Sequence, residues 1–229
     1  MGRVNFQTIF NRYKRVGKAN VRLTQSSLIL SQPINATKTV YNFDVLETQT
    51  ANLTPDQIRL NLNDEFIIAT MGIYLQASLK NEEGLDTGVK KLFTYAPMEL
   101  DQVSMRKVQN LYNGQLSIAV NNIVYLEKWD TAKHENVSRT QYANLVAAPG
   151  AQATQPSNNY SKDAMFPVEP LITLSGAKKN NLSLSLSQAI APTGFTFTDD
   201  KGIASTYSID RIVWVMRGLN AQNGAVFQS

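Results

Sequence analysis

The side chains best suited to acid–base or metal chemistry are one histidine and three pairs of neighbouring acids. His134 is the only histidine and lies in the polar run 130–136, and the acid pairs are Asp64-Glu65, Glu82-Glu83 and Asp199-Asp200. A histidine acts as a general base or metal ligand when a second functional group stands beside it. Paired carboxylates bind calcium or cleave glycosidic bonds when another acid faces them. Each pair adjoins turn residues and the histidine stands alone, so we expect solvated surface groups here and no metal site.

The short motifs of nucleotide-binding and hydrolytic enzymes are absent. The sequence contains no G-x-x-x-x-G-K-[ST], no G-x-G-x-x-G and no G-x-S-x-G, the patterns that bring backbone N–H groups to phosphate or expose a nucleophilic serine. It also contains no cysteine, which excludes disulfides, thiolate metal sites and cysteine nucleophiles. We therefore expect a protein that is not an enzyme and that uses no cofactor and no small-molecule substrate.

Four aromatic residues leave a second kind of site open. They are Tyr112, Tyr125, Trp129 and Tyr142. Aromatic rings with a polar tip form sugar-binding strips, and they also serve as half-buried sheet residues whose tips reach the surface. The spacing alone does not decide between these two uses.

The N-terminal segment, residues 1–20, has the pattern of a basic amphipathic helix. Its apolar side chains recur at spacings of three and four between residues 4 and 18, and basic side chains fill much of the rest. The residues expected to contact a partner are Phe6, Ile9, Phe10, Arg12, Tyr13, Lys14, Arg15 and Lys18. A helix of about 15 residues is marginal in isolation, so it must pack on a surface. That surface is either the chain's own domain or a neighbouring subunit, nucleic acid or lipid.

The charge of the chain is unevenly distributed. The formal net charge is +4, yet seven basic residues and no acid precede Asp44, and 15 basic and 18 acidic residues follow. A basic head on a mildly acidic body indicates that the head has its own, phosphate-bearing partner. No apolar run approaches the roughly 20 residues of a membrane span, and the first residues lack the apolar core of a secretory signal.

Residues 171–190, LITLSGAKKNNLSLSLSQAI, give the clearest secondary-structure pattern. Leu182, Leu184 and Leu186 alternate with serines, which predicts a strand with one apolar face and one hydroxyl face. The apolar run 171–174 precedes it, and Gly176 lies in the polar stretch between the two runs. The pattern predicts a β-hairpin whose leucine face lies on a core.

The remaining chain predicts further strands and little helix. Strands are expected at 21–31, 39–48, 57–62, 66–77, 115–128 and 207–216, with a bulge or a turn at Asn121-Asn122 and long loops at 80–91 and 147–160. The run 66–77 is nearly continuous apolar sequence, typical of a strand buried on both faces. Hydrophobic residues make up 43% of the chain, enough for a packed core. We expect an all-β antiparallel β-sandwich over residues 21–229, a single jelly roll with uneven strand spacing.

This layout resembles that of bacteriophage virion structural proteins, the jelly-roll capsid proteins in particular. The residues that carry the resemblance are 6–18, LYNGQLSIAVNNIVYLEKW at 111–129, the hairpin 166–186 and the strand 207–216. It covers most of the chain without a diagnostic motif. Members of this group build shells, some around an internal membrane, and a double jelly roll generally needs a longer chain.

The resemblance implies a capsid or capsid-associated subunit that self-assembles into the virion shell inside the host cytoplasm. Its partners would be further copies, other virion proteins and, through the N-terminal segment, the genome or a lipid membrane. The alternative is a carbohydrate- or receptor-binding jelly-roll module of a phage spike or fibre, for which the aromatic residues above are the motivation.

Overall fold

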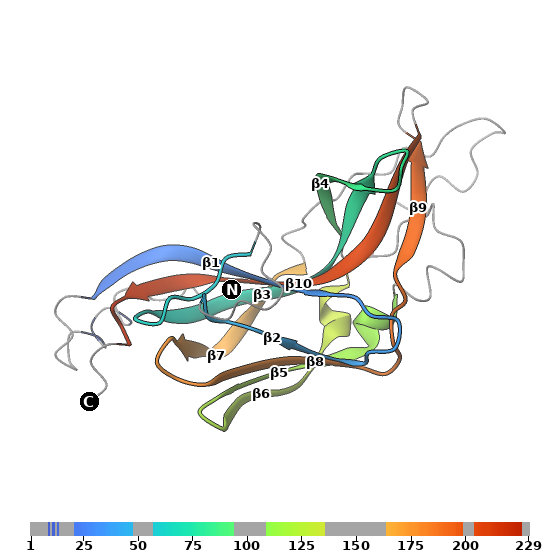
Figure 1. Ribbon diagram of the computed structural model, residues 1–229. Helices are drawn as coiled ribbons and strands as arrows, with labels where there is room; N and C mark the ends of the chain where they lie inside the picture. Colours follow the sequence, from blue (N-terminus) through green and yellow to red (C-terminus); the bar gives the residue numbers. More distant parts are fainter. Residues whose placement is uncertain are drawn as a thin grey trace, which may run out of the picture.

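The chain folds into two antiparallel sheets that pack face to face (Figure 1). The computed structural model describes residues 21–47, 57–93, 109–135, 164–198 and 204–225, together with Ile9, Asn11 and Tyr13. The first sheet contains β1 (Arg22–Pro33), β3 (Glu65–Lys80), β4 (Asp86–Phe93), β7 (Phe166–Ser175), β9 (Thr193–Thr198) and β10 (Ala204–Gln222). The second sheet contains β2 (Val40–Phe43), β5 (Gly114–Val120), β6 (Ile123–Asp130) and β8 (Asn180–Leu186). The expected all-β antiparallel sandwich is confirmed.

Two long strands form the centre of the first sheet. β10 pairs with β3 along its length, with β1 through residues 211–222 and with β9 through residues 204–209. On its other side, β3 pairs first with β7 and then with β4. The C-terminal end of β3 and the N-terminal end of β10 pair with β4 and β9. Together they form an extension of the first sheet that rises away from the second sheet (Figure 1). The second sheet has the order β2-β8-β5-β6.

The expected strand at 66–77 is confirmed as part of β3, which is buried on both faces over most of its length. Phe66, Ile68 and Ile73 point into the sandwich, whereas Ile67 and Tyr74 belong to apolar clusters on the outer face of the same sheet. Neighbouring side chains of a strand point to opposite faces, so a strand with covered faces on both sides needs a continuous apolar run.

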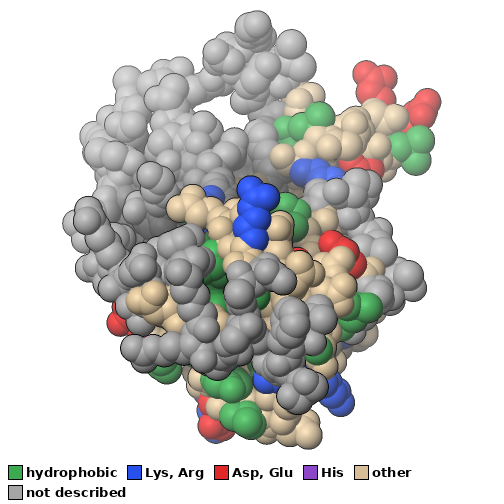
Figure 2. All heavy atoms as spheres, turned by 90° about the vertical axis from the view of Figure 1, so that its left-hand side faces the viewer, with side chains coloured by type: hydrophobic (Ala, Val, Ile, Leu, Met, Phe, Trp, Pro, Cys, Tyr) green, Lys and Arg blue, Asp and Glu red, His purple; other side chains and the backbone are tan. Residues whose placement is uncertain are grey.

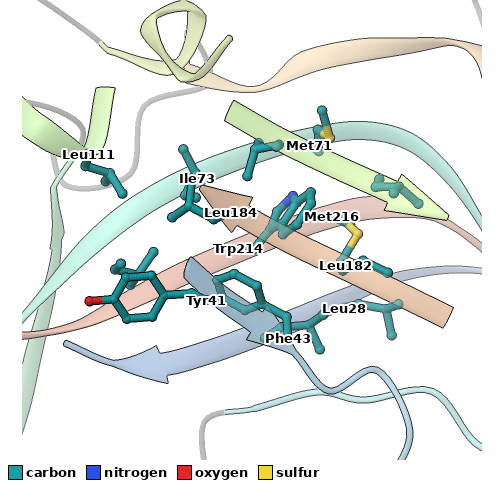
Figure 3. Close-up of a cluster of buried hydrophobic side chains, with 14 of the residues drawn as sticks. Leu28, Tyr41, Phe43, Met71, Ile73, Leu111, Leu182, Leu184, Trp214 and Met216 are labelled. Carbon is teal, nitrogen blue, oxygen red and sulfur yellow. The ribbon is translucent and has the colours of Figure 1, made fainter. Parts of the chain in front are cut away.

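The core lies between the two sheets (Figure 3). Leu182, Leu184 and Leu186 of β8 are buried, as their alternation predicts, and the serines between them lie on the other face. Trp214 of β10 faces them from the first sheet. Its ring meets that of Phe43 edge to face, with the ring centroids 5.5 Å apart. Such an edge-to-face pair adds to the stabilisation that burial already gives.

Three of the expected strands differ in the structure. The stretch 115–128 forms two strands, β5 and β6, joined by a turn at Asn121-Asn122. β2 is limited to Val40–Phe43, and the expected strand at 57–62 contributes only isolated bridges from Ile58 to Ile29 and from Leu60 to Leu46. The Leu60 N–H donates to the Val45 carbonyl, and the Leu60 carbonyl accepts from the Glu47 N–H. Residues 57–60 therefore bond partly to β1 and partly to the chain just after β2. Because these bonds go to two different partners, the segment forms no continuous strand despite its alternating sequence.

The expected loop at 80–91 is a β-hairpin, although residues 81–90 are exposed as expected. Asn81 closes the turn, because its N–H donates to the Leu85 carbonyl and its side chain accepts from the Leu85 N–H. Gly84 and Gly88 have φ values of +79° and +81°, a left-handed conformation that glycine adopts without strain. The polar residues of this segment correctly predicted that it is exposed, but they gave no sign that β3 and β4 pair there.

Several expectations fall outside the described residues. They are the loop at 147–160, most of the N-terminal segment and the aromatic residue Tyr142. Nowhere in the described part does a helix reach the length and hydrophobicity that crossing a membrane requires.

Candidate functional site

The outer face of the first sheet is apolar where β3 and β10 lie side by side. Ile67 of β3 and Leu219 and Ala221 of β10 form a cluster there that is separate from the core of the sandwich. Val21, just before β1, belongs to the same cluster. Apolar side chains on the outer face of a sheet need a cover, because leaving them in water forfeits about 1.5–3 kcal/mol for each large side chain.

Two residues of the N-terminal segment supply part of that cover. Ile9 and Tyr13 have helical backbone conformation and are 8% and 7% exposed, both within the outer-face cluster. Residues four apart lie on one face of a helix, so the apolar stripe read from the sequence meets the chain's own sheet at these two positions. The other expected contact residues lie outside the described part of the chain; they are Phe6, Phe10, Arg12, Lys14, Arg15 and Lys18.

A buried hydrogen bond fixes Tyr13 on the sheet. Its hydroxyl donates to Glu65 Oε2 over 2.7 Å, and Glu65, the first residue of β3, is only 5% exposed. A carboxylate removed from water needs donors to replace its hydration. The bond joins residues 52 positions apart, so no local pattern in the sequence indicates it.

Tyr13→Phe should lower the free energy of unfolding by about 1–3 kcal/mol, because it removes one donor from a buried carboxylate and leaves the ring in place. Urea unfolding followed by circular dichroism measures the change. Tyr125→Phe is the matched control, since Tyr125 is 48% exposed. Equal stability of the two variants would mean that the segment does not pack on its own sheet in solution.

A hollow of about 690 Å³ lies beside this cluster on the same sheet. Its described lining residues are Gln25, Ser26, Ser27, Ala69, Arg217, Gly218 and Leu219. Arg217 is the one charged side chain among them, and these described lining residues include no acid or histidine that could activate a serine hydroxyl. The described lining can hydrogen-bond a polar group, and it contains no nucleophile–base pair.

His134 is buried, contrary to the solvated position expected from its polar neighbours. It is 0% exposed at the end of η2 (Thr131–His134), and one ring nitrogen lies 2.9 Å from the Ala164 carbonyl. The polar neighbours in sequence predicted exposure, but the residue that covers the ring, Ala164, is 30 positions away and could not be inferred from them. The ring is part of the packed interior at this position.

The four aromatic residues do not assemble into a strip as far as the structure describes them. Tyr112 is 2% exposed in the core, Tyr125 is exposed on β6, and Trp129 is half-buried under the ammonium group of Lys133, 4.1 Å from the ring centroid. Tyr142 lies outside the described residues. These three positions therefore share no common aromatic surface in the described structure.

The expectation of solvated acid pairs is wrong for Glu65, which is buried and accepts from the Tyr13 hydroxyl, because a residue 52 positions away supplies its donor. Asp64 accepts from the side chain of Asn220 and from the N–H of Asn223, and Glu82 and Glu83 are exposed at the β3–β4 turn. Within the described ranges, no three acid or histidine side chains come close enough to hold a metal ion. Asp199 and Asp200 lie outside them.

The described surface carries no dominant charge on the face drawn in Figure 2. Lysine and arginine side chains are scattered among acids there, and neither sign forms a continuous patch among the coloured residues. Although basic residues outnumber acids before Asp44, the described residues in this view do not form a basic face.

Comparison with known proteins adds no relative. No protein-family model matches the chain, and no curated protein matches it either.

Proposed function

We propose that this chain is a structural protein of a bacteriophage virion, a capsid or capsid-associated subunit built on a single jelly roll. Its work is assembly. The sandwich is the building block, and the basic N-terminal segment links it to neighbouring subunits, to the genome or to a lipid membrane. Assembly takes place in the host cytoplasm, and the protein then resides in the virion.

The order of strand pairing is the observation that carries the proposal. Leaving aside β4 and β9, which belong to the extension, eight strands remain. The first of them pairs with the last, the second with the seventh, the third with the sixth and the fourth with the fifth, as β1–β10, β2–β8, β3–β7 and β5–β6. Nested pairing of this kind is what wrapping a long hairpin around a sandwich produces, and jelly rolls of eight strands recur in viral capsids and lectins.

The site geometry favours assembly over sugar binding. The lectin-like alternative relied on aromatic residues that lie apart from one another in the described structure. The assembly proposal relies on a basic segment whose apolar residues Ile9 and Tyr13 are held on the outer face of the first sheet. Fold alone does not determine function, so the discriminating evidence has to come from the behaviour of the purified protein.

The direct test is the assembly state. Mass photometry and negative-stain electron microscopy of the purified protein should show rings, shells or shell fragments as the concentration rises, alone or with its virion partners. A protein that stays monomeric under all these conditions would contradict the proposal. Binding to immobilised glycans by such a monomer would favour the alternative.

Replacing Arg12, Lys14 and Arg15 by glutamine should weaken assembly most at low salt. Phosphate-bearing partners attract these charges, and salt screens that attraction over about 10 Å at 0.1 M. Assembly yield across a salt series measures the effect. The matched control replaces three exposed lysines of the body, Lys90, Lys128 and Lys179, and should assemble like the unaltered protein. Equal losses in both variants would show that total charge matters and that the segment has no partner of its own.

A further inference from the structure

His134 bridges the two sheets at one end of the sandwich. Its ring lies between Trp129 of β6 in the second sheet and Ala164, two residues before β7 of the first sheet. Phe166 of β7 meets the ring edge to face, with ring centroids 5.4 Å apart at 87°. The side chain is therefore held by residues of both layers.

Both ring nitrogens are engaged, and their partners dictate the protonation state. The Trp129 indole N–H donates to Nε2 over 3.1 Å. Because an indole nitrogen is only a donor, Nε2 must offer a lone pair. The proton therefore sits on Nδ1, which donates to the Ala164 carbonyl over 2.9 Å. A neutral imidazole satisfies both partners. An imidazolium would place an N–H against the indole N–H and could satisfy only Ala164.

The electrostatic surroundings also favour the neutral ring. Burial lowers the pKa of His134 below the ordinary 6.5, the Ala164 hydrogen bond opposes this, Lys133 adds to the lowering, and Asp130 opposes it. Among the described groups, the charges that act on the ring are those of Lys133 and Asp130. The elements around the ring also carry Glu127 and Lys128 on β6, Glu169 on β7, Glu135 directly after η2, and Tyr112 on η1 (Asn110–Asn113), which contacts η2. Burial raises the pKa values of Glu135 and Tyr112, so both groups also resist ionisation in this region.

We propose that His134 is a pH-sensitive latch between the two sheets, which acid opens on the β6 side. Protonation at Nε2 breaks the bond from Trp129 and leaves the bond to Ala164 intact. Trp129, which packs against the core, then loses the hydrogen bond of its indole N–H, although Lys133 still lies over its ring. The imidazole stays attached to the chain before β7. The latch depends only on these contacts and not on the proposed function.

The sign of the pH dependence follows from linkage. With a folded pKa below the unfolded value, the unfolded chain binds more protons, so stability falls as the pH drops below about 6.5 and through the folded pKa. Glu135 and Asp210 act in the opposite sense, because burial raises their pKa values and folding favours their protonation. A bulk unfolding curve would mix these contributions, so the test must observe His134 and Trp129 individually.

Nuclear magnetic resonance can do so, because the chain has one histidine and two tryptophans. Between pH 7.5 and 4.5, the imidazole signals should titrate with a midpoint below 6.5. The Trp129 indole N–H signal should shift with the same midpoint, and that of Trp214 should stay unchanged. Trp129→Phe should raise the His134 midpoint, because the proton then has no competing donor at Nε2.

His134→Gln supplies the matched control, since its amide keeps one donor and one acceptor and does not titrate. In that variant the Trp129 indole signal should no longer shift over this pH range. A His134 midpoint at or above 6.5 would overturn the proposal. A Trp129 indole signal that does not shift during the titration would also overturn it, as would a His134 midpoint that Trp129→Phe leaves unchanged. These readouts need only the unaltered chain and Trp129→Phe, so they remain valid if His134→Gln does not fold.

Discussion

Leu184→Asp should abolish the folded state. Leu184 is 0% exposed at the centre of β8, opposite Tyr41 of β2 and Leu116 of β5. The substitution removes a large apolar side chain from the core and buries a carboxylate without a partner. The cost should be several kcal/mol, comparable with the whole stability of an ordinary domain, about 5–15 kcal/mol. Thermal melts by circular dichroism should show no cooperative transition.

Ser185→Asp is the control for that experiment. Ser185 is the next residue along β8, exposed on the opposite face of the same sheet. Its carboxylate would remain in water, so the variant should melt within a few degrees of the unaltered protein. If Leu184→Asp gave a native-like melt as well, the leucines would not face the core.

Gly218→Val should destabilise the protein by about 3 kcal/mol or more, because the added side chain has no room. Gly218 lies where the register of β10 against β3 shifts. A Cβ atom there would overlap the Ile67 carbonyl oxygen and come within 3.1 Å of the Ala69 nitrogen. Backbone atoms cannot swing aside as a side chain can, so the two central strands would have to separate. Urea unfolding measures the loss.

Gly194→Val tests whether the effect belongs to that site. Gly194 lies in β9, at the edge of the extension, where the nearest atoms would be at ordinary contact distance, 3.8 Å or more. This variant should retain nearly full stability. Similar losses in both variants would point to a general intolerance of β-branched residues and not to the contact with Ile67.

The sequence predicts the fold best where the pattern is local. The alternating leucines of 182–186 and the continuous apolar run of 66–77 each follow from the two-residue period of a strand, so both were predictable. The segment 57–62 alternates equally well, yet forms only isolated bridges, because a strand requires a partner that its own sequence does not reveal. Residues 80–91 show the reverse, since turn residues concealed a hairpin.

The candidate sites were less predictable than the fold, for a physical reason. The bond from Tyr13 to Glu65 and the contact of His134 with Ala164 join residues 52 and 30 positions apart. Residue types can indicate an amphipathic helix or a lone histidine. They cannot tell which side chain will satisfy a buried carboxylate, or whether a polar run will fold beneath the start of a later strand.

The two long strands also have a mechanical consequence. β3 and β10 pass as continuous strands from the sandwich into the extension, and they pair with each other along both parts, with a register shift between Ile209 and Arg211. A load applied at the β3–β4 turn therefore pulls on the backbone hydrogen bonds between β3 and β10, which continue into the sandwich past Trp214. Strain at the tip is shared by many bonds in parallel instead of falling on a flexible joint, so the extension acts as a lever anchored in the middle of the molecule.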